Sequence, residues 1–146
     1  MKRINTILSF TVLALLLSAC EVNNRVAVID AWARANVPGQ SVGAAYMTFI
    51  SADDSTFIHA ETPLASSVEI HSMTMDNGVM KMRMLPEMPL KAGKAEKLAP
   101  GGFHLMLFDL KKPFKAGEQL ELKLTFRDAA GKVTQQNVTL PIKEEE

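Results

Sequence analysis

The chain has 146 residues, of which 47% are hydrophobic and 22% charged, with 16 Lys and Arg against 16 Asp and Glu. This length fits one ordinary globular domain, and the balanced charge provides no basic field that would attract nucleic-acid phosphates. The single Cys excludes an internal disulfide and any metal site built on two or more cysteines. Nine Met against one Trp and one Tyr is the unusual feature of the composition.

The N-terminal segment has the features of an export signal. Lys2 and Arg3 precede an apolar stretch, Ile7 to Leu17, whose 11 residues are too few to span a hydrocarbon core that needs about 20. The run Leu17-Ser18-Ala19-Cys20 resembles the lipobox of bacterial lipoproteins. An ordinary signal peptide that happens to end in Cys is the alternative.

The lipobox resemblance implies a lipoprotein signal peptide over residues 1–19, lipidation of Cys20, and a short linker over residues 20–26. Several acyl chains on this Cys would make anchoring stable, because a single chain binds membranes only marginally. The next residue is Glu21, not the Asp often found in lipoproteins that stay at the inner membrane. We therefore expect a lipid-anchored protein of the periplasm or cell envelope, at the outer membrane.

The following part of the chain is predicted to be one all-β domain over residues 27–142. Short β-rich segments are separated by clusters of Gly, Pro, Asn and Asp, which is typical of an antiparallel β-sandwich or barrel. Leu85 to Gly102, rich in Pro and Gly, is expected to be a long irregular connection, and residues 143–146 an acidic tail. The predicted strands are Ala27–Arg34, Ala44–Ile50, Ser67–Met75, Val79–Met84, Phe103–Leu110, Gln119–Arg127 and Lys132–Pro141.

One predicted hairpin carries most of the methionines. Asn77 and Gly78 tolerate the positive φ that both central residues of a type I′ turn require, so they are expected to be the loop residues. The pairs that follow are Asp76 with Val79, Met75 with Met80, Met73 with Met82, and His71 with Met84. Since side chains alternate between faces, His71 and all five methionines share one face. Core packing is the simpler explanation of such a face, because Met fills cores as a flexible hydrophobe.

A second pair, His104 and Met106, adds a chemical argument. The two are separated by one residue, so both project from one face of their strand while Leu105 and Leu107 project from the other. Two imidazoles and two or more thioethers, with no thiolate, form a soft and neutral ligand set. Cu(I) prefers such ligands, whereas Zn²⁺ gains little from thioethers, and Ca²⁺ or Mg²⁺ requires oxygen. Thioethers also suit an oxidising compartment, because they form no disulfides.

The spacing His71-x10-Met82-x21-His104-x-Met106 resembles that of the periplasmic copper chaperone family known as PCuAC. Val68–His71, Asn77–Arg83 and Pro100–Leu107 share in the resemblance, which covers nearly the whole mature chain. It implies a cupredoxin-like β-barrel and delivery of copper to enzymes such as the CuA centre of cytochrome c oxidase subunit II, or to another copper chaperone.

The resemblance also implies a ligand set. One Cu(I) per chain would be bound near the surface by His71, Met82, His104 and Met106. Met73 and Met84 are interpreted as auxiliary metal ligands, and the surplus methionines as shielding or as a transient transfer track.

Other features have simpler interpretations. His59 is expected to be a surface or structural histidine in a loop, and Trp32 and Tyr46 are expected to be core residues. The sequence contains no Gly-rich phosphate loop, nucleophile elbow or His-Glu-x-x-His run, so we expect a binding protein and not an enzyme. The alternative function is that of a metal-free β-sandwich lipoprotein for envelope assembly or adhesion, in which the Met face only packs.

Overall fold

The computed structural model describes residues 25–144, and the regular structure in this part of the chain consists of strands. The strands are β1 (Val26–Arg34), β2 (Gly43–Ser51), β3 (Ser55–Glu61), β4 (Ser67–Asp76), β5 (Val79–Leu85), β6 (Met88–Leu90), β7 (Ala95–Leu98), β8 (His104–Phe108), β9 (Gln119–Asp128) and β10 (Val133–Lys143). The all-β prediction is therefore confirmed. Between residues 25 and 144 there is no helix with the length and apolar character to cross a membrane. The expected signal peptide and Cys20 lie outside the described residues.

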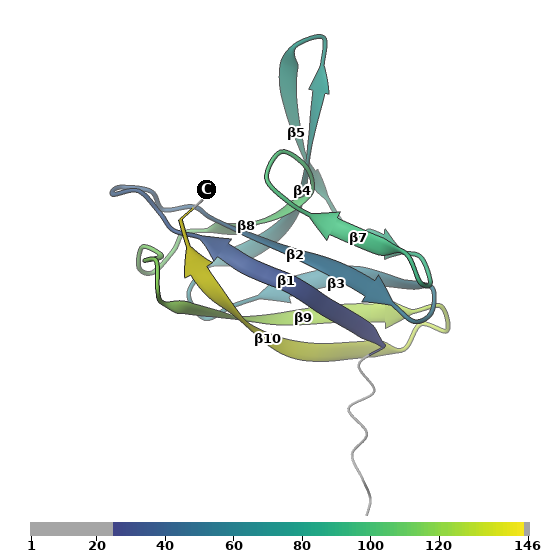
Figure 1. Ribbon diagram of the computed structural model, residues 1–146. Coiled ribbons are helices and arrows are strands. Elements are labelled where there is room, and N and C mark those ends of the chain that lie inside the picture. Colours follow the sequence, from purple (N-terminus) through teal and green to yellow (C-terminus); the bar gives the residue numbers. More distant parts are fainter. Residues whose placement is uncertain (1–24, 145–146) are drawn as a thin grey trace, which may run out of the picture.

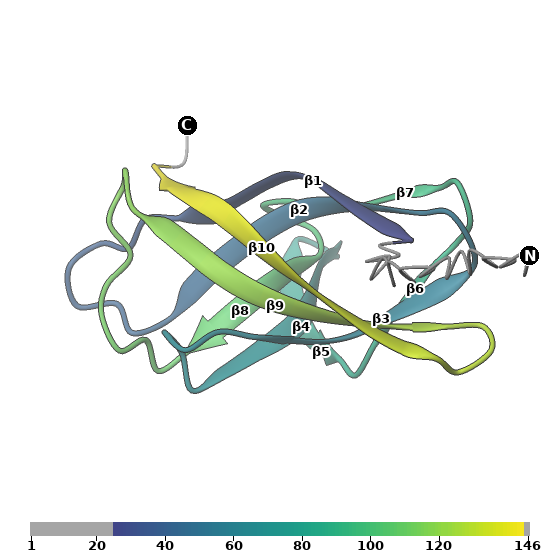
Figure 2. The same ribbon diagram turned by 90° about the horizontal axis from the view of Figure 1, so that it is seen from below.

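The strands form two layers that meet along one side (Figures 1 and 2). One layer has the order β5-β4-β8-β2-β1, with β7 also paired to β2, and the other has the order β10-β9-β3-β6. The layers join where β1 pairs with β10 in parallel, so the sheet is mixed, although the other pairs of named strands are antiparallel, as expected. A parallel pair cannot be closed by a tight turn, and β1 and β10 are the first and last strands, so local turn signals do not reveal their pairing.

The core lies between the layers and is built mainly from the inward-facing residues of the sandwich strands. Phe49, Phe57 and Phe126 form an aromatic cluster, with ring centroids separated by 4.9, 5.5 and 5.3 Å. Leu105 and Leu107 of β8 point into the same core and are fully buried. The other face of β8 is therefore turned away from the core, as its alternation predicts.

The segment between β5 and β8 differs from the prediction of an irregular connection. It contains the short strands β6 and β7, and Met88, Leu90 and Leu98 in it are buried. Pro89 is tolerated because β6 lies at the edge of its layer, where the missing N–H breaks no inner ladder. The Pro and Gly content of the segment marks its turns and its edge, and not a lack of structure.

Asp54 ties this segment to the turn between β2 and β3. Its Oδ1 accepts a hydrogen bond of 2.9 Å from the backbone N–H of Ala92, and its Oδ2 lies 3.0 Å from Lys91 Nζ. The backbone hydrogen bond and then the nearby ammonium hold the pKa of the Asp54 carboxyl below its ordinary value. Both interactions favour the charged form in the folded state.

β3 is the third strand that the sequence analysis missed. His59 lies on it, and not in a loop, with a side chain that is 56% exposed and an Nε2 3.7 Å from Glu61 Oε2. The expectation of a surface histidine is therefore confirmed, but its placement in a loop is wrong. The apolar signal of β3 is short, because Phe57 and Ala60 are its only buried residues.

β4 and β5 form a hairpin that projects beyond the sandwich (Figure 1). Asn77 and Gly78 have φ values of 50° and 75°, as a type I′ turn requires. Every predicted pair, from His71 with Met84 to Asp76 with Val79, is present in the register. β4 also pairs with β8, but only from Ser67 to His71, so the outer part of the hairpin extends past the sheet.

Candidate metal centre

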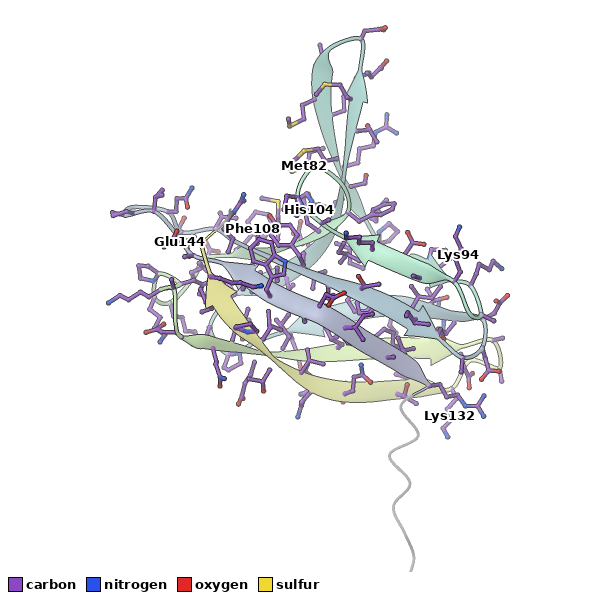
Figure 3. The ribbon with its side chains drawn as sticks, in the orientation of Figure 1. Met82, Lys94, His104, Phe108, Lys132 and Glu144 are labelled. Atoms are coloured by element: carbon purple, nitrogen blue, oxygen red, sulfur yellow. The ribbon has the colours of Figure 1, made fainter. Side chains whose placement is uncertain are left out.

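Three adjacent strands bring the predicted ligands together. Met82 is on β5, His71 on β4, and His104 and Met106 are on β8, and these strands are neighbours in the layer. His71 pairs directly with His104, and their ring centroids are 5.8 Å apart. Met82 and His104 lie on the same side of the molecule, where the hairpin leaves the sandwich (Figure 3).

His104 is oriented by the turn that precedes β8. The side chain is almost fully buried, and its Nδ1 lies 3.0 Å from the backbone oxygen of Gly102. Because a carbonyl oxygen can only accept, Nδ1 carries the hydrogen of the neutral ring and donates it to Gly102. The lone pair of His104 is therefore on Nε2, which is the nitrogen left to bind a metal.

His71 is oriented by Glu69, a residue that the sequence analysis missed. His71 Nε2 donates a hydrogen bond of 2.8 Å to Glu69 Oε2, which leaves the lone pair of the neutral ring on Nδ1. This Nδ1 is buried and has no hydrogen-bond partner among residues 25–144. A buried polar atom without a partner costs about 1–3 kcal/mol, and a metal ion at Nδ1 would satisfy it. A signal for Glu69 existed, because residues two apart on a strand share a face.

A cavity of about 280 Å³ opens beside these side chains. Met73, Met82, His104 and Met106 line it, so three of the four predicted ligands share one wall. His71 does not line the cavity and instead stands next to His104, across the β4–β8 pair. The remaining wall comes from Arg34, Asn36, Gln40, Val42, Gly43, Ala44, Tyr46 and Pro100.

Trp32 and Tyr46 were expected in the core. Tyr46 is indeed buried, with 3% of its surface exposed, but neither residue belongs to the cluster between the layers. Their neighbours Ala33 and Ala45 point into the core and are fully buried, so Trp32 and Tyr46 point to the opposite face. There the two rings lie 4.6 Å apart, and Tyr46 lines the cavity. β2 is buried on both faces, so its sequence does not show which apolar residues face the core.

The two methionines predicted as auxiliary ligands differ in position. Met73, which pairs with Met82 across the two strands, lines the cavity. Met84, which pairs with His71, does not line it, and 59% of its surface is exposed. Met75 and Met80 form the outermost Met pair and are 66% and 58% exposed. The methionines thus run from the cavity wall to the exposed end of the hairpin, and core packing does not account for them.

The arrangement offers two imidazole lone pairs and several thioethers on one side of a sheet. Neutral imidazoles and thioethers bring no negative charge to a bound metal ion. Thioethers are also soft ligands, which favour Cu(I) over harder cations. The second nitrogen of each ring donates to an oxygen, which is the usual way in which proteins orient a metal-binding histidine. The donor set therefore fits Cu(I).

Comparison with known sequences places this chain among lipoprotein relatives. A family model described as "Putative lipoprotein LpqE-like" matches residues 26–142. "Putative lipoprotein Lxx21020" of Leifsonia xyli is 30% identical over 106 residues, which are 72% of this chain and 64% of that protein. "Uncharacterized protein RP573" of Rickettsia prowazekii is 30% identical over 111 residues, which are 72% of this chain and 61% of that protein. The chain thus spans less than two thirds of the length of either relative.

Solved structures share the fold. The solution structure of CuI-DR1885 from Deinococcus radiodurans is 32% identical, with a TM-score of 0.60, over 79% of this chain and 76% of that one. The apo form of DR1885 is 28% identical, with a TM-score of 0.62, over 99% of this chain and 95% of that one. The copper-bound PCuAC domain from PmoF2 is 20% identical, with a TM-score of 0.67, over 83% of this chain and 94% of that one, and it supports the fold alone.

Proposed function

This chain belongs to the LpqE-like lipoprotein family and has the fold of PCuAC domains, and from that premise we propose that it is an extracytoplasmic Cu(I) carrier. One Cu(I) is held by His71 through Nδ1, His104 through Nε2, and the thioethers of Met82 and Met106. The ion is the cargo of the protein, which passes it to copper enzymes such as the CuA centre of cytochrome c oxidase, or to another copper chaperone.

The observation that carries this proposal is the state of the two histidines. Glu69 and Gly102 each accept a hydrogen bond from one ring nitrogen of His71 and His104, respectively. The other nitrogen of each neutral ring keeps its lone pair and can bind a metal. The donor atom of His71 is buried without a partner. An adhesion or assembly protein has no need of two histidines oriented in this way beside methionine thioethers, whereas a metal carrier does.

A solved relative supports the choice of metal. DR1885, which is 32% identical to this chain over most of its length, has been solved as its CuI form. Neutral His and Met ligands also leave the ion free to move toward an acceptor with thiolate ligands, because soft thiolates hold Cu(I) more firmly. The position of the cavity at the base of a projecting hairpin gives an acceptor access to the ion.

Competitive Cu(I) titration with a chromogenic chelator tests the ligand set. We expect one tightly bound Cu(I) in the wild type, and more than about 100-fold weaker binding in His104→Ala, because even residues that only orient a ligand change metal affinity by about 10- to 100-fold. Met82→Leu, which keeps the volume but removes the sulfur, should also weaken binding. His59→Ala is the matched control, since His59 is exposed on β3 in the other layer. Equal affinities in all four proteins would contradict the proposal.

The anchor is tested separately. Cys20→Ala should release the protein from the membrane fraction without changing copper stoichiometry, because the lipid and the metal share no residue. A wild-type protein that fractionates as soluble would leave the export signal standing but not the lipid anchor.

Transfer distinguishes a carrier from a store. The Cu(I)-loaded protein should metallate an apo CuA-type acceptor at a rate that rises with acceptor concentration, because the acceptor offers its own ligand before the last donor bond breaks. A rate equal to spontaneous copper release, whatever the acceptor concentration, would indicate buffering.

A further inference from the structure

The β4–β5 hairpin carries more methionines than the proposed site uses. Five of the nine methionines of the chain lie on one face of this hairpin, together with His71. The opposite face holds Ser72, Thr74, Asp76, Val79, Lys81 and Arg83. The hairpin is therefore amphipathic in its outer half, although β8 pairs with β4 only as far as His71 and the tip of the hairpin projects away from the sandwich (Figure 1).

The exposure of these methionines separates them from ordinary core residues. Met47 and Met88 of the sandwich are 1% and 3% exposed, whereas Met75 and Met80 are 66% and 58% exposed. Scattered exposed apolar residues are normal, but a contiguous row of them marks a site of interaction. The row contains no Leu, Ile, Val or Phe, which would serve an apolar contact equally well. What distinguishes the residues of this row from other apolar residues is the thioether sulfur atom that each one carries.

The register places these sulfur atoms within reach of one ion. Met75 pairs with Met80, and the next pair inward on the same face is Met73 with Met82. Residues directly opposite on an antiparallel pair have Cβ atoms about 4.5–5.5 Å apart, and diagonal neighbours are about 7–8 Å apart. A Met side chain is unbranched and flexible, so the sulfur atoms of three methionines from two adjacent pairs can converge. Figure 3 shows sulfur atoms on the projecting hairpin above His104.

We propose that Met75, Met80 and Met73 form a second Cu(I) site, weaker than the first, on the outer half of the hairpin. Thioethers are the soft, neutral ligands that favour Cu(I), and they remain unprotonated in acid. The outer site is weaker because it lacks an imidazole and lies open to water. The existence of this outer site does not depend on the proposed function, whereas a role in passing copper from the inner site to an acceptor does.

Continuity with the inner cavity gives the outer site its role. Met73 lines the cavity with Met82 and is also the neighbour of Met75 along β4. An ion can therefore pass from the inner donors to the outer ones by exchanging one thioether at a time, without release into water. The end of the hairpin is the part of this path that an acceptor protein reaches first (Figure 1).

The test is a Cu(I) titration of the full chain in detergent, under anaerobic reducing conditions, with methyl-¹³C-labelled methionine. Cu(I) is diamagnetic, so each methyl signal reports its own sulfur. We expect the first equivalent to shift the His71 and His104 ring signals with Met82, and the second equivalent to shift Met75 and Met80. The double variant Met75→Leu/Met80→Leu should reduce the stoichiometry from two to one. Met88→Leu, a buried methionine on β6, is the matched control and should keep both equivalents.

The outcomes separate the two proposals. If Met75 and Met80 signals do not move at any stage, or if the double Leu variant still binds two equivalents, the outer site is wrong. If those signals move while both imidazoles stay unshifted, the outer site stands and the proposed His and Met ligand set fails. In His104→Ala, the second site should still load, because it contains no histidine.

Discussion

Methionine has opposite surroundings in the sandwich and in the β4–β5 hairpin. Met47 and Met88 are buried between the layers, where their contribution is apolar area removed from water. Met75 and Met80 are mostly exposed on the hairpin, where little such area is gained. The same residue type therefore contributes apolar burial in one region and exposes its thioethers in the other, where we propose that they bind Cu(I).

The largest expected effect is on the sandwich. Phe57 is fully buried and contacts Phe49 and Phe126, so Phe57→Ala should lower the free energy of unfolding by about 3–5 kcal/mol. Met75→Ala removes a side chain that is mostly exposed, so it should change the free energy of unfolding by about 0.5 kcal/mol or less. Urea denaturation of the metal-free protein measures both. Similar losses in the two variants would contradict the division of roles.

The next largest effect is expected on Cu(I) affinity, at the base of the hairpin. Glu69→Ala should weaken Cu(I) binding by about 10- to 100-fold, because it removes the acceptor that orients His71. Glu69→Gln should lose less, since its amide oxygen can still accept the ring hydrogen. ¹⁵N NMR of the imidazole should show that the hydrogen of His71 leaves Nε2 in the Ala variant.

A matched control exists in the other layer. Glu61 lies beside His59 on β3 with the same spacing of two residues, 3.7 Å from the ring. Glu61→Ala should leave copper affinity unchanged. If it weakens binding as much as Glu69→Ala does, general electrostatics and not the orientation of His71 is responsible.

A smaller effect is expected at the end of the hairpin. Gly78 has a φ of 75°, and a Cβ there meets no other atom within 4 Å, so only backbone strain opposes a side chain. Gly78→Ala should cost about 1 kcal/mol, the penalty of a left-handed conformation for an L-residue. Gly102→Ala, at a glycine without a positive φ, is the control for stability. Equal stability of Gly78→Ala and the wild type would argue against the type I′ turn.

The smallest effect concerns the turn that Asp54 ties to the β6–β7 segment. The folded pKa of Asp54 lies below its unfolded value, so the carboxylate stabilises the fold above the unfolded pKa of about 3.9 and this contribution disappears as pH falls through the folded value. Asp54→Asn should therefore lower the melting temperature slightly at neutral pH. The difference from the wild type should shrink below about pH 4. A difference that is constant with pH would show that charge is not involved.

Local signals in the sequence were sufficient for the hairpin. Asn77 and Gly78 determine a two-residue turn, and a two-residue turn determines every pair along β4 and β5. The shared face of His71 and the methionines follows from that register. The alternation of His104 and Met106 with buried leucines was equally readable, because a strand repeats every two residues.

Strands with few buried residues were not readable in this way. β3 has only two, Phe57 and Ala60, and β6 and β7 are three and four residues long in a segment whose Pro, Gly and charged residues resemble a loop. Tyr46 is buried as expected, but Tyr46 and its partner Trp32 lie on the face of the cavity and not between the layers, which their apolar character does not reveal.

The sequence by itself determined the all-β class, the hairpin register and the residue types of the candidate site, since each depends on neighbours along the chain. Only the tertiary structure decided that β4 pairs with β8, which sets His71 beside His104, and that β1 pairs with β10. It also decided that Glu69 accepts a hydrogen bond from the ring of His71 and that Gly102 accepts one from the ring of His104. These contacts depend on how distant strands are ordered and how side chains are oriented within the sheet, and turn and alternation signals carry no information about either.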